Sequence, residues 1–360
     1  MINDIDRRIN RYLEFYKKEE PALLLHVRCL NRMADPGKQS YLNTLWHSDF
    51  HKKEHREKFF DDLYDEVMDE NRLHPLADDY LPSGKIVWGP IFSVIIKDRP
   101  INAQEHSSWL EPCLPDLGEI DRLRFKLDEN NFWWQLYKEA KENLSRRLEF
   151  VTPVYHQGIL DLAWDLRGND LYTDFYEDPE QALKLVEFCT DALIRIGDAS
   201  RAIRPADART DYWVPGWGFN ALVPGYGGIT TCDTSCQLSP EFFQAFEVPY
   251  MEKIQNHAPG WLLHSHSVGA RHQRTYATLP GLEILQIVAD PNIPTPAESM
   301  PDIVDRIGLK PVIITTTPDM IYKNIDALKR ARAVIRASVA DEKEGAELLA
   351  FVRRHSRISD

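Results

Sequence analysis

Two histidines separated by a single residue, His264 and His266, follow the apolar run 261–263. Side chains two positions apart on a strand point to the same side, so both imidazoles face one side if the strand continues to His266. Two such imidazoles can hold a metal ion, or they can bind a substrate and move its protons. Structural imidazoles bonded to the backbone are the alternative. The spacing therefore predicts a chemical site at the end of a strand, with both histidines as catalytic candidates.

A metal held by these two histidines would need a third protein ligand. Zinc accepts histidine nitrogen, carboxylate oxygen and cysteine sulfur, and its catalytic sites often have three protein ligands and one open position. A Cys-x₃-Cys spacing is uncommon for zinc, although one helical turn would bring the two sulfurs together. We therefore expect a zinc site with a carboxylate or thiol as third ligand. The candidates are Asp233, Cys232, Cys236, Asp290 and Asp341.

Other side chains suited to a substrate lie in loops or at expected strand ends. The segment 212–219 is rich in aromatic residues and glycine, and its flat rings could stack on a planar or sugar-like ligand, pack on a rim, or form a homodimer contact. The segment 156–157 follows an expected strand, a usual place for substrate groups. The candidates are His156 and Asp233 for catalysis, and Trp217, Tyr226, Gln157, Arg28 and Asp290 for substrate binding.

The elements that would position these residues become regular after about residue 150. Helix starts are marked by Asp178 and Ser239, each followed by proline and glutamate. Before them, helices are expected at 4–18 and 52–70, with an apolar run at 22–27. The expected strands are 150–155, 219–223, 261–266, 282–289, 310–315 and 333–339, and the later helices are 178–199, 239–256, 301–307, 317–328 and 342–354.

Strands that alternate with helices indicate a parallel sheet. At least six such strands fit, which favours an α/β TIM (β/α)₈ barrel over an open sheet. The sequence has no glycine-rich dinucleotide fingerprint and no phosphate-binding Gly-Lys-Ser/Thr motif. We expect a single domain in which an irregular helical extension, 1–80, packs on a barrel formed by 81–360.

Composition limits the partners. The chain has 360 residues, of which 43% are hydrophobic and 28% charged, and a formal net charge of −13. Nucleic-acid binding needs a basic face, so this charge argues against it. No stretch approaches the roughly 20 apolar residues of a membrane helix. The five cysteines form no even framework. We expect a cytoplasmic protein with free thiols that acts on a small molecule.

Several blocks resemble the uroporphyrinogen decarboxylase superfamily, which includes zinc-dependent corrinoid methyltransferases. The resemblance covers about residues 80–354 and implies a TIM barrel with its site at the barrel mouth. His264-x-His266 lies where the methyltransferases carry His-x-Cys-Gly. The other similar blocks are Trp109-Leu110-Glu111-Pro112, Leu166-Arg167-Gly168, the segment 176–180, and 238–243 followed by Val248-Pro249-Tyr250.

Two departures limit what the resemblance implies about the reaction. The decarboxylase's Arg-Gln-Ala-Gly-Arg motif has no match after Leu23–Arg28, and the stretch 335–341, at the end of the last expected strand, has no cysteine. The leading hypothesis is a methyltransferase-like enzyme with metal-assisted methyl transfer. Its corrinoid would be carried by a partner protein, since no Asp-x-His-x-x-Gly signature occurs here. The alternatives are a metal-free decarboxylase or lyase, in which the histidines and Asp233 move protons, and a non-catalytic barrel that binds a ligand.

Overall fold

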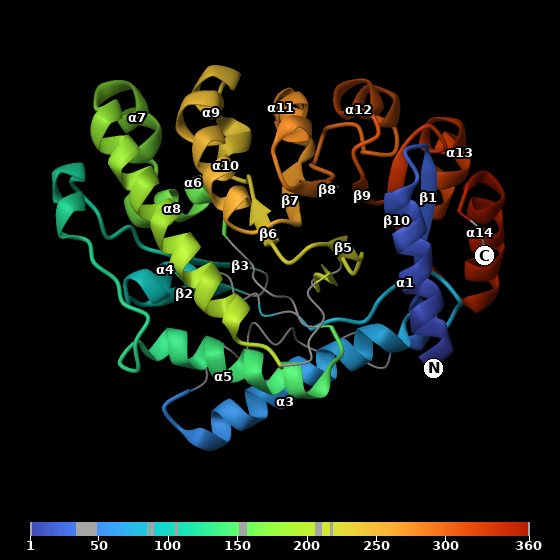
Figure 1. Ribbon diagram of the computed structural model, residues 1–360, viewed down its shortest axis with the longest axis horizontal. Helices are drawn as coiled ribbons and strands as arrows, with labels where there is room; N and C mark the ends of the chain where they lie inside the picture. Colours follow the sequence, from blue (N-terminus) through green and yellow to red (C-terminus); the bar gives the residue numbers. More distant parts are fainter. Residues whose placement is uncertain are drawn as a thin grey trace.

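The computed structural model describes residues 2–33, 49–84, 86, 90–104, 107–150, 157–205, 211–216 and 219–358. The fold is mixed α/β. Figure 1 shows strands along a curve with helices on its outer side. None of the helices in these ranges is long and apolar enough to cross a membrane.

A six-stranded parallel sheet forms the centre of the protein. The first strand in the chain, β1, pairs with the last, β10, and β6 is the opposite edge. Pairing of the first strand with the last is expected in a barrel, although no closed barrel is seen among the described residues. The strands are β1 (Ala22–Cys29), β6 (Gly228–Thr231), β7 (Trp261–His266), β8 (Leu282–Val288), β9 (Val312–Thr315) and β10 (Arg332–Val339), in the order β1-β10-β9-β8-β7-β6.

Of the predicted strand 150–155, only Phe150 lies among the described residues. Gly84 N–H donates a hydrogen bond to the Phe150 carbonyl at 2.8 Å, so these two residues lie side by side. Gly158 N–H donates to Thr231 Oγ1, at the end of β6, at 2.7 Å. Gly158 therefore lies beside the carboxyl end of β6.

The helices begin where the sequence supplies caps. The side chains of Asp178, Ser239 and Thr317 accept hydrogen bonds from backbone N–H groups three residues later, and each is followed by proline. The described helices are α1 (Ile2–Lys17), α3 (Lys53–Arg72), α4 (Ile91–Ile96), α5 (Phe132–Arg147), α6 (Ile159–Arg167), α7 (Asp170–Glu177), α8 (Pro179–Ala202), α9 (Pro240–Phe246), α10 (Val248–His257), α11 (Gln273–Thr278), α12 (Met300–Ile307), α13 (Pro318–Leu328) and α14 (Glu342–His355).

The segment 1–80, expected as an extension on the barrel, also supplies a strand of the sheet, β1. The edge of β1 away from β10 is covered by two buried carboxylates. Asp79 accepts a hydrogen bond from Leu25 N–H at 2.9 Å, and Asp78 accepts one from Val27 N–H at 2.8 Å. Arg11 of α1 pairs with Asp79 at 2.6 Å. These contacts tie α1 and the chain around residue 79 to the edge of the sheet.

Two predicted elements differ from the structure. Residues 219–222 form no strand, because Asn220 has a positive φ of 40° and its side chain donates to the Leu81 carbonyl. The strand of the central sheet that precedes β7 in the chain is β6 instead, and its glycine-rich start gave no strand pattern. The predicted helix 239–256 is two helices. Pro249 lacks the N–H that a continuous helix would need, and Glu247 between them is not helical.

Candidate metal and active site

His264 and His266 occupy the carboxyl end of β7. His264 is in register with Thr231 of β6 and with Gln286 of β8. The run before it, Trp261–Leu263, is fully buried and anchors the strand. The predicted strand is confirmed, and both histidines lie at its end. His264 is buried, whereas the side chain of His266 is 28% exposed.

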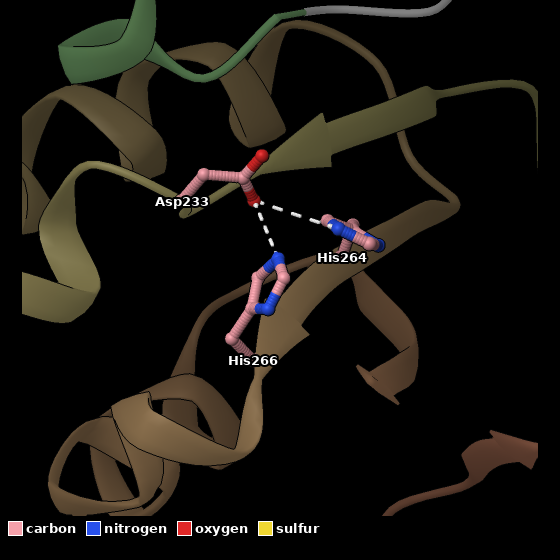
Figure 2. A group of neighbouring side chains, drawn as sticks. All are labelled: Asp233, His264 and His266. Atoms are coloured by element: carbon pink, nitrogen blue, oxygen red, sulfur yellow. Dashed lines mark ion pairs between the residues drawn. The ribbon is translucent and has the colours of Figure 1, made fainter. Parts of the chain in front are cut away.

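Asp233 completes a three-residue group with the histidines. It lies two residues after β6, and its carboxylate points toward both rings (Figure 2). Asp233 Oδ1 is 3.5 Å from Nε2 of His264 and 3.5 Å from Nε2 of His266. One ligand atom from each residue lies within 4.8 Å of the other two. Half of the Asp233 side chain is exposed, so the group opens toward solvent.

The outer nitrogen of each ring is already occupied. Nδ1 of His264 bonds Oε1 of Gln286. Nδ1 of His266 donates to Asp290 Oδ1 at 2.7 Å, and the other oxygen of Asp290 accepts from Val268 N–H at 2.8 Å. A hydrogen-bond acceptor at Nδ1 fixes the ring proton there and leaves Nε2 as the nitrogen that can bind a metal ion. Both rings therefore present Nε2 to the same point.

The charges of the group are strongly interdependent. The hydrogen bond with Asp233 raises the pKa of His266 to about 9, against partial burial and with help from Asp290. Burial lowers the pKa of His264, against the negative charge of Asp233. Burial alone would raise the pKa of Asp233, but the hydrogen bond from His266 and the charges of both histidines lower it. A metal-free site therefore carries a proton on His266 at neutral pH.

The donor set fits a divalent cation. Two atoms that lie each about 2.05 Å from a tetrahedral zinc ion are about 3.4 Å apart. The two distances of 3.5 Å between Nε2 atoms and Asp233 Oδ1 match this value. Imidazole nitrogen and carboxylate oxygen are accepted zinc ligands. Asp233, rather than a thiol, thus fits as the third ligand.

The sulfurs of the two nearby cysteines stay outside this group. Cys232 and Cys236 are buried, and within the described ranges neither sulfur joins the cluster of Asp233 and the two histidines. A Cβ atom on Gly269 would lie 2.5 Å from Cys236 Sγ, so this thiol packs against the backbone after β7. Burial raises the pKa of Cys232 well above its usual value and that of Cys236 to about 12. Both therefore favour the neutral thiol over the thiolate that binds metal.

Asp161, near the start of α6, holds the turn that carries Asp233. Its Oδ1 accepts a hydrogen bond from Thr234 N–H at 2.7 Å, and its Oδ2 accepts one from the Thr231 hydroxyl. Burial and the charge of Asp233 raise the pKa of Asp161 to about 6. A Cβ on Gly158 would lie 2.4 Å from Asp161 Oδ2 and 2.3 Å from the Thr231 carbonyl oxygen, so glycine is needed for this approach.

Three of the residues predicted to bind substrate, Gln157, Asp290 and Arg28, have other partners in the structure. Gln157 donates to Asp165 at 2.5 Å and accepts from the Ser93 hydroxyl at 3.1 Å. Asp290 orients His266, as described above.

Arg28, at the carboxyl end of β1, pairs with Glu70 of α3 at 2.8 Å.

Tyr226 lies at the other end of the sheet. Its N–H donates to the Pro259 carbonyl before β7 begins, and Arg204 lies over its ring. The structure therefore does not bring Tyr226 to the group around Asp233. The predicted site residues His156 and Trp217 lie outside the described residues.

Sequence patterns gave little signal for two supporting residues. Gln286 is one of two polar residues in the otherwise apolar strand β8, on the face that a period-two pattern would assign to the histidines. Asp161 is one of two acidic residues in its helix, and its contacts with Thr231 and Thr234 distinguish it. Each of them contacts a residue that lies 22 or more positions away in the sequence.

The comparisons with known proteins bear on the fold. No protein-family model matches the chain, and no curated protein sequence matches it. A solved structure, a methyltransferase from Methanosarcina mazei, is similar over 96% of this chain and 97% of its own, with a TM-score of 0.59. Sequence identity is 13%. The likeness is one of fold.

Proposed function

We propose that this protein is a metal-dependent, methyltransferase-like enzyme of the uroporphyrinogen decarboxylase superfamily, with its site at the mouth of a closed (β/α)₈ barrel. Closure is supported by the pairing of β1 with β10 and by the hydrogen bond that joins Gly84 to Phe150. The site then lies at the carboxyl ends of the strands, where barrel enzymes carry their chemistry.

The observation that carries the metal proposal is the orientation of the two imidazoles. Gln286 and Asp290 occupy both Nδ1 atoms, and both Nε2 atoms face Asp233 Oδ1. A zinc ion bound there would act as a Lewis acid that lowers the pKa of a bound oxygen or sulfur nucleophile. The half-exposed side of Asp233 leaves room for that substrate. Asp290 holds His266 in place, and Asp161 holds the turn of Asp233.

Methyl transfer is supported by the sequence blocks that resemble those of the superfamily and by the likeness in fold to a methyltransferase. The methyl group would pass from a methylated corrinoid to an oxygen or sulfur atom of a small substrate. The nucleophile would lose its proton to solvent and form the new bond with its own electron pair, and the pair of the broken carbon–cobalt bond would stay on the corrinoid. The corrinoid would belong to a partner protein.

Metal analysis of the purified full-length chain tests the first part of the proposal. We expect about one divalent cation per chain, lost in His264→Ala and in Asp233→Ala. His257→Ala is the matched control, because His257 is 43% exposed and pairs with Asp198 away from the site. Absence of a stoichiometric metal after incubation with zinc, or equal metal content in His264→Ala and His257→Ala, would overturn it.

Methylcobalamin tests the second part. Metal-loaded protein is incubated with methylcobalamin and a panel of small thiols, alcohols and amines, and loss of the methyl group is followed by absorbance. We expect demethylation with at least one acceptor, and its loss in His264→Ala. If the protein binds metal but no acceptor gives demethylation that depends on His264, methyl transfer is wrong while the metal site stands.

The position of His266 favours a second candidate, a metal-free decarboxylase or lyase. His266 lies between Asp233 and Asp290, which together raise its pKa to about 9. A protonated imidazole at neutral pH can donate a proton to a developing carbanion. This candidate requires activity that persists in chelator-treated protein and that falls as the pH rises through about 9. The same chelator treatment abolishes activity in the metal-dependent proposal.

A further inference from the structure

A positively charged side chain faces the same side of the sheet as the metal-site histidines. His264 is in register with Gln286, Gln286 with Ile313, and Ile313 with Val334. Arg336 lies two residues beyond Val334 on β10, as His266 lies two residues beyond His264 on β7. Side chains two residues apart share a face. Arg336 is therefore on the face of His266 and at its level along the strands.

Arg336 is poorly paired for a mostly buried cation. Its side chain is 17% exposed, and its Nη2 is 4.0 Å from the nearest Glu70 oxygen. Its Nε is buried without a hydrogen-bond partner among the described residues. Burial lowers the pKa of Arg336. A guanidinium that is removed from water without close partners costs free energy, so a ligand that supplies an anionic partner would recover it.

Glu70, the nearest carboxylate, is shared with Arg28, which lies closer to it than Arg336 does. Arg28 Nε is 2.8 Å from Glu70 Oε1, and Arg28 Nη2 donates to Oε2 at 3.0 Å. His74 also lies 3.5 Å from the same carboxylate. Two guanidinium groups thus share one carboxylate at this end of the sheet. The more weakly held of the two, Arg336, has binding capacity left.

The neighbouring strand supplies a second polar group. Thr315, at the end of β9, is in register with Arg336 and is exposed. Residues in register on adjacent parallel strands point to the same side, so the hydroxyl of Thr315 and the guanidinium of Arg336 face the same space. A hydroxyl beside a planar guanidinium suits the oxygens of a carboxylate or phosphate.

We propose that Arg336, with Thr315, binds an anionic group, a carboxylate or a phosphate, of the small molecule that reacts at Asp233 and the two histidines. The link to the reaction rests on the proposed function, whereas the anion site itself does not. Three strand spacings of about 4.8 Å separate β7 from β10. The anionic group therefore lies within about 14 Å of the metal site, several bonds from the reacting atom.

Anion binding to metal-free protein tests this proposal independently of the metal. The full-length chain is treated with a chelator that is then removed, and titrated calorimetrically with inorganic phosphate and with succinate. Succinamide, the uncharged analogue of succinate, is the ligand control. We expect binding of at least one anion and none of succinamide. We expect Arg336→Gln to weaken that binding about tenfold or more, since a charge-assisted hydrogen bond is lost. Comparison of the two anions distinguishes a phosphate from a carboxylate site.

Arg32→Gln is the matched control, because Arg32 is 54% exposed and pairs with Glu342. It should bind as the wild type does. If Arg336→Gln fails to fold, Arg336→Lys decides: we expect several-fold weaker binding, because lysine lacks the planar fork of arginine. The proposal would be overturned if the wild type bound neither anion, or if the Arg336 variants bound as tightly as the wild type. It would also be overturned if Arg32→Gln lost as much affinity as Arg336→Gln. If the protein binds no stoichiometric metal but its anion binding depends on Arg336, the proposed function is wrong and the anion site stands.

Discussion

Asp290 holds His266 through one carboxylate oxygen and the backbone of Val268 through the other, at 2.7 and 2.8 Å. The carboxylate thus fixes the ring to the turn that follows its own strand. The ring cannot rotate about its bonds without losing the hydrogen bond at Nδ1. Nε2 is therefore directed at Asp233 before any metal or substrate binds.

Replacement of Asp290 by asparagine should weaken metal binding without removing a ligand. The amide keeps the shape of the side chain but loses the charge that orients and polarises His266, and such outer partners typically contribute 10- to 100-fold to metal affinity. A competition titration with a zinc indicator measures the change. Asp302→Asn, at a side chain that is 71% exposed, is the control. Equal zinc affinity in the two variants would contradict this role for Asp290.

Metal affinity should depend steeply on pH. The metal-free site holds a proton on His266, whose pKa is raised to about 9, and a metal must displace that proton. Apparent affinity should therefore fall about tenfold for each pH unit below about 9. Titrations between pH 6.5 and 8.5 measure the slope. An affinity that does not change over this range would show that His266 binds no proton in the metal-free site.

Asp161 should make the metal-free protein less stable as the pH rises. Its pKa is raised to about 6 in the folded state, against about 3.9 in an unfolded chain. The protonated form is favoured by folding, so its contribution is fully present below about pH 4 and is lost as the pH rises through about 6. Relative to Asp161→Asn, the wild type should lose roughly 2 kcal/mol of unfolding free energy between pH 4 and 7.

Denaturant unfolding of chelator-treated protein at several pH values measures this difference. Asp305→Asn, at a carboxylate that is 69% exposed, should follow the wild type throughout. If the difference between the wild type and Asp161→Asn stays constant with pH, Asp161 does not carry the shifted pKa.

The two cysteines after β6 should be dispensable for metal binding. Cys232 and Cys236 are buried outside the cluster of Asp233, His264 and His266, and their raised pKa values oppose thiolate formation. We expect the double variant Cys232→Ala/Cys236→Ala to retain the metal content of the wild type, measured per folded chain, whereas Asp233→Ala loses it. A loss of metal in the double variant alone would make a thiolate the third ligand instead.

Much of the regular structure could be predicted from local patterns. The strand at 261–266 has its predicted bounds, and the helices that begin after Asp178 and Thr317 start where their caps and prolines indicate. These features depend on contacts within a few residues. The glycine-rich strand β6 and the turn at Asn220 could not be predicted in this way, because contacts with Gly260 and Leu81 determine them.

The sequence by itself determined that His264 and His266 face one side at the end of a strand, since alternation is a local property of extended backbone. It left five residues open as the third ligand. Only the tertiary structure decided among them. Parallel pairing of β6 with β7 brings Asp233 within 3.5 Å of both Nε2 atoms, whereas the sulfurs of Cys232 and Cys236 stay outside the group. The tertiary structure also brought Gln286, Asp290 and Asp161 to the site, because strand pairing joins residues that are far apart in the chain.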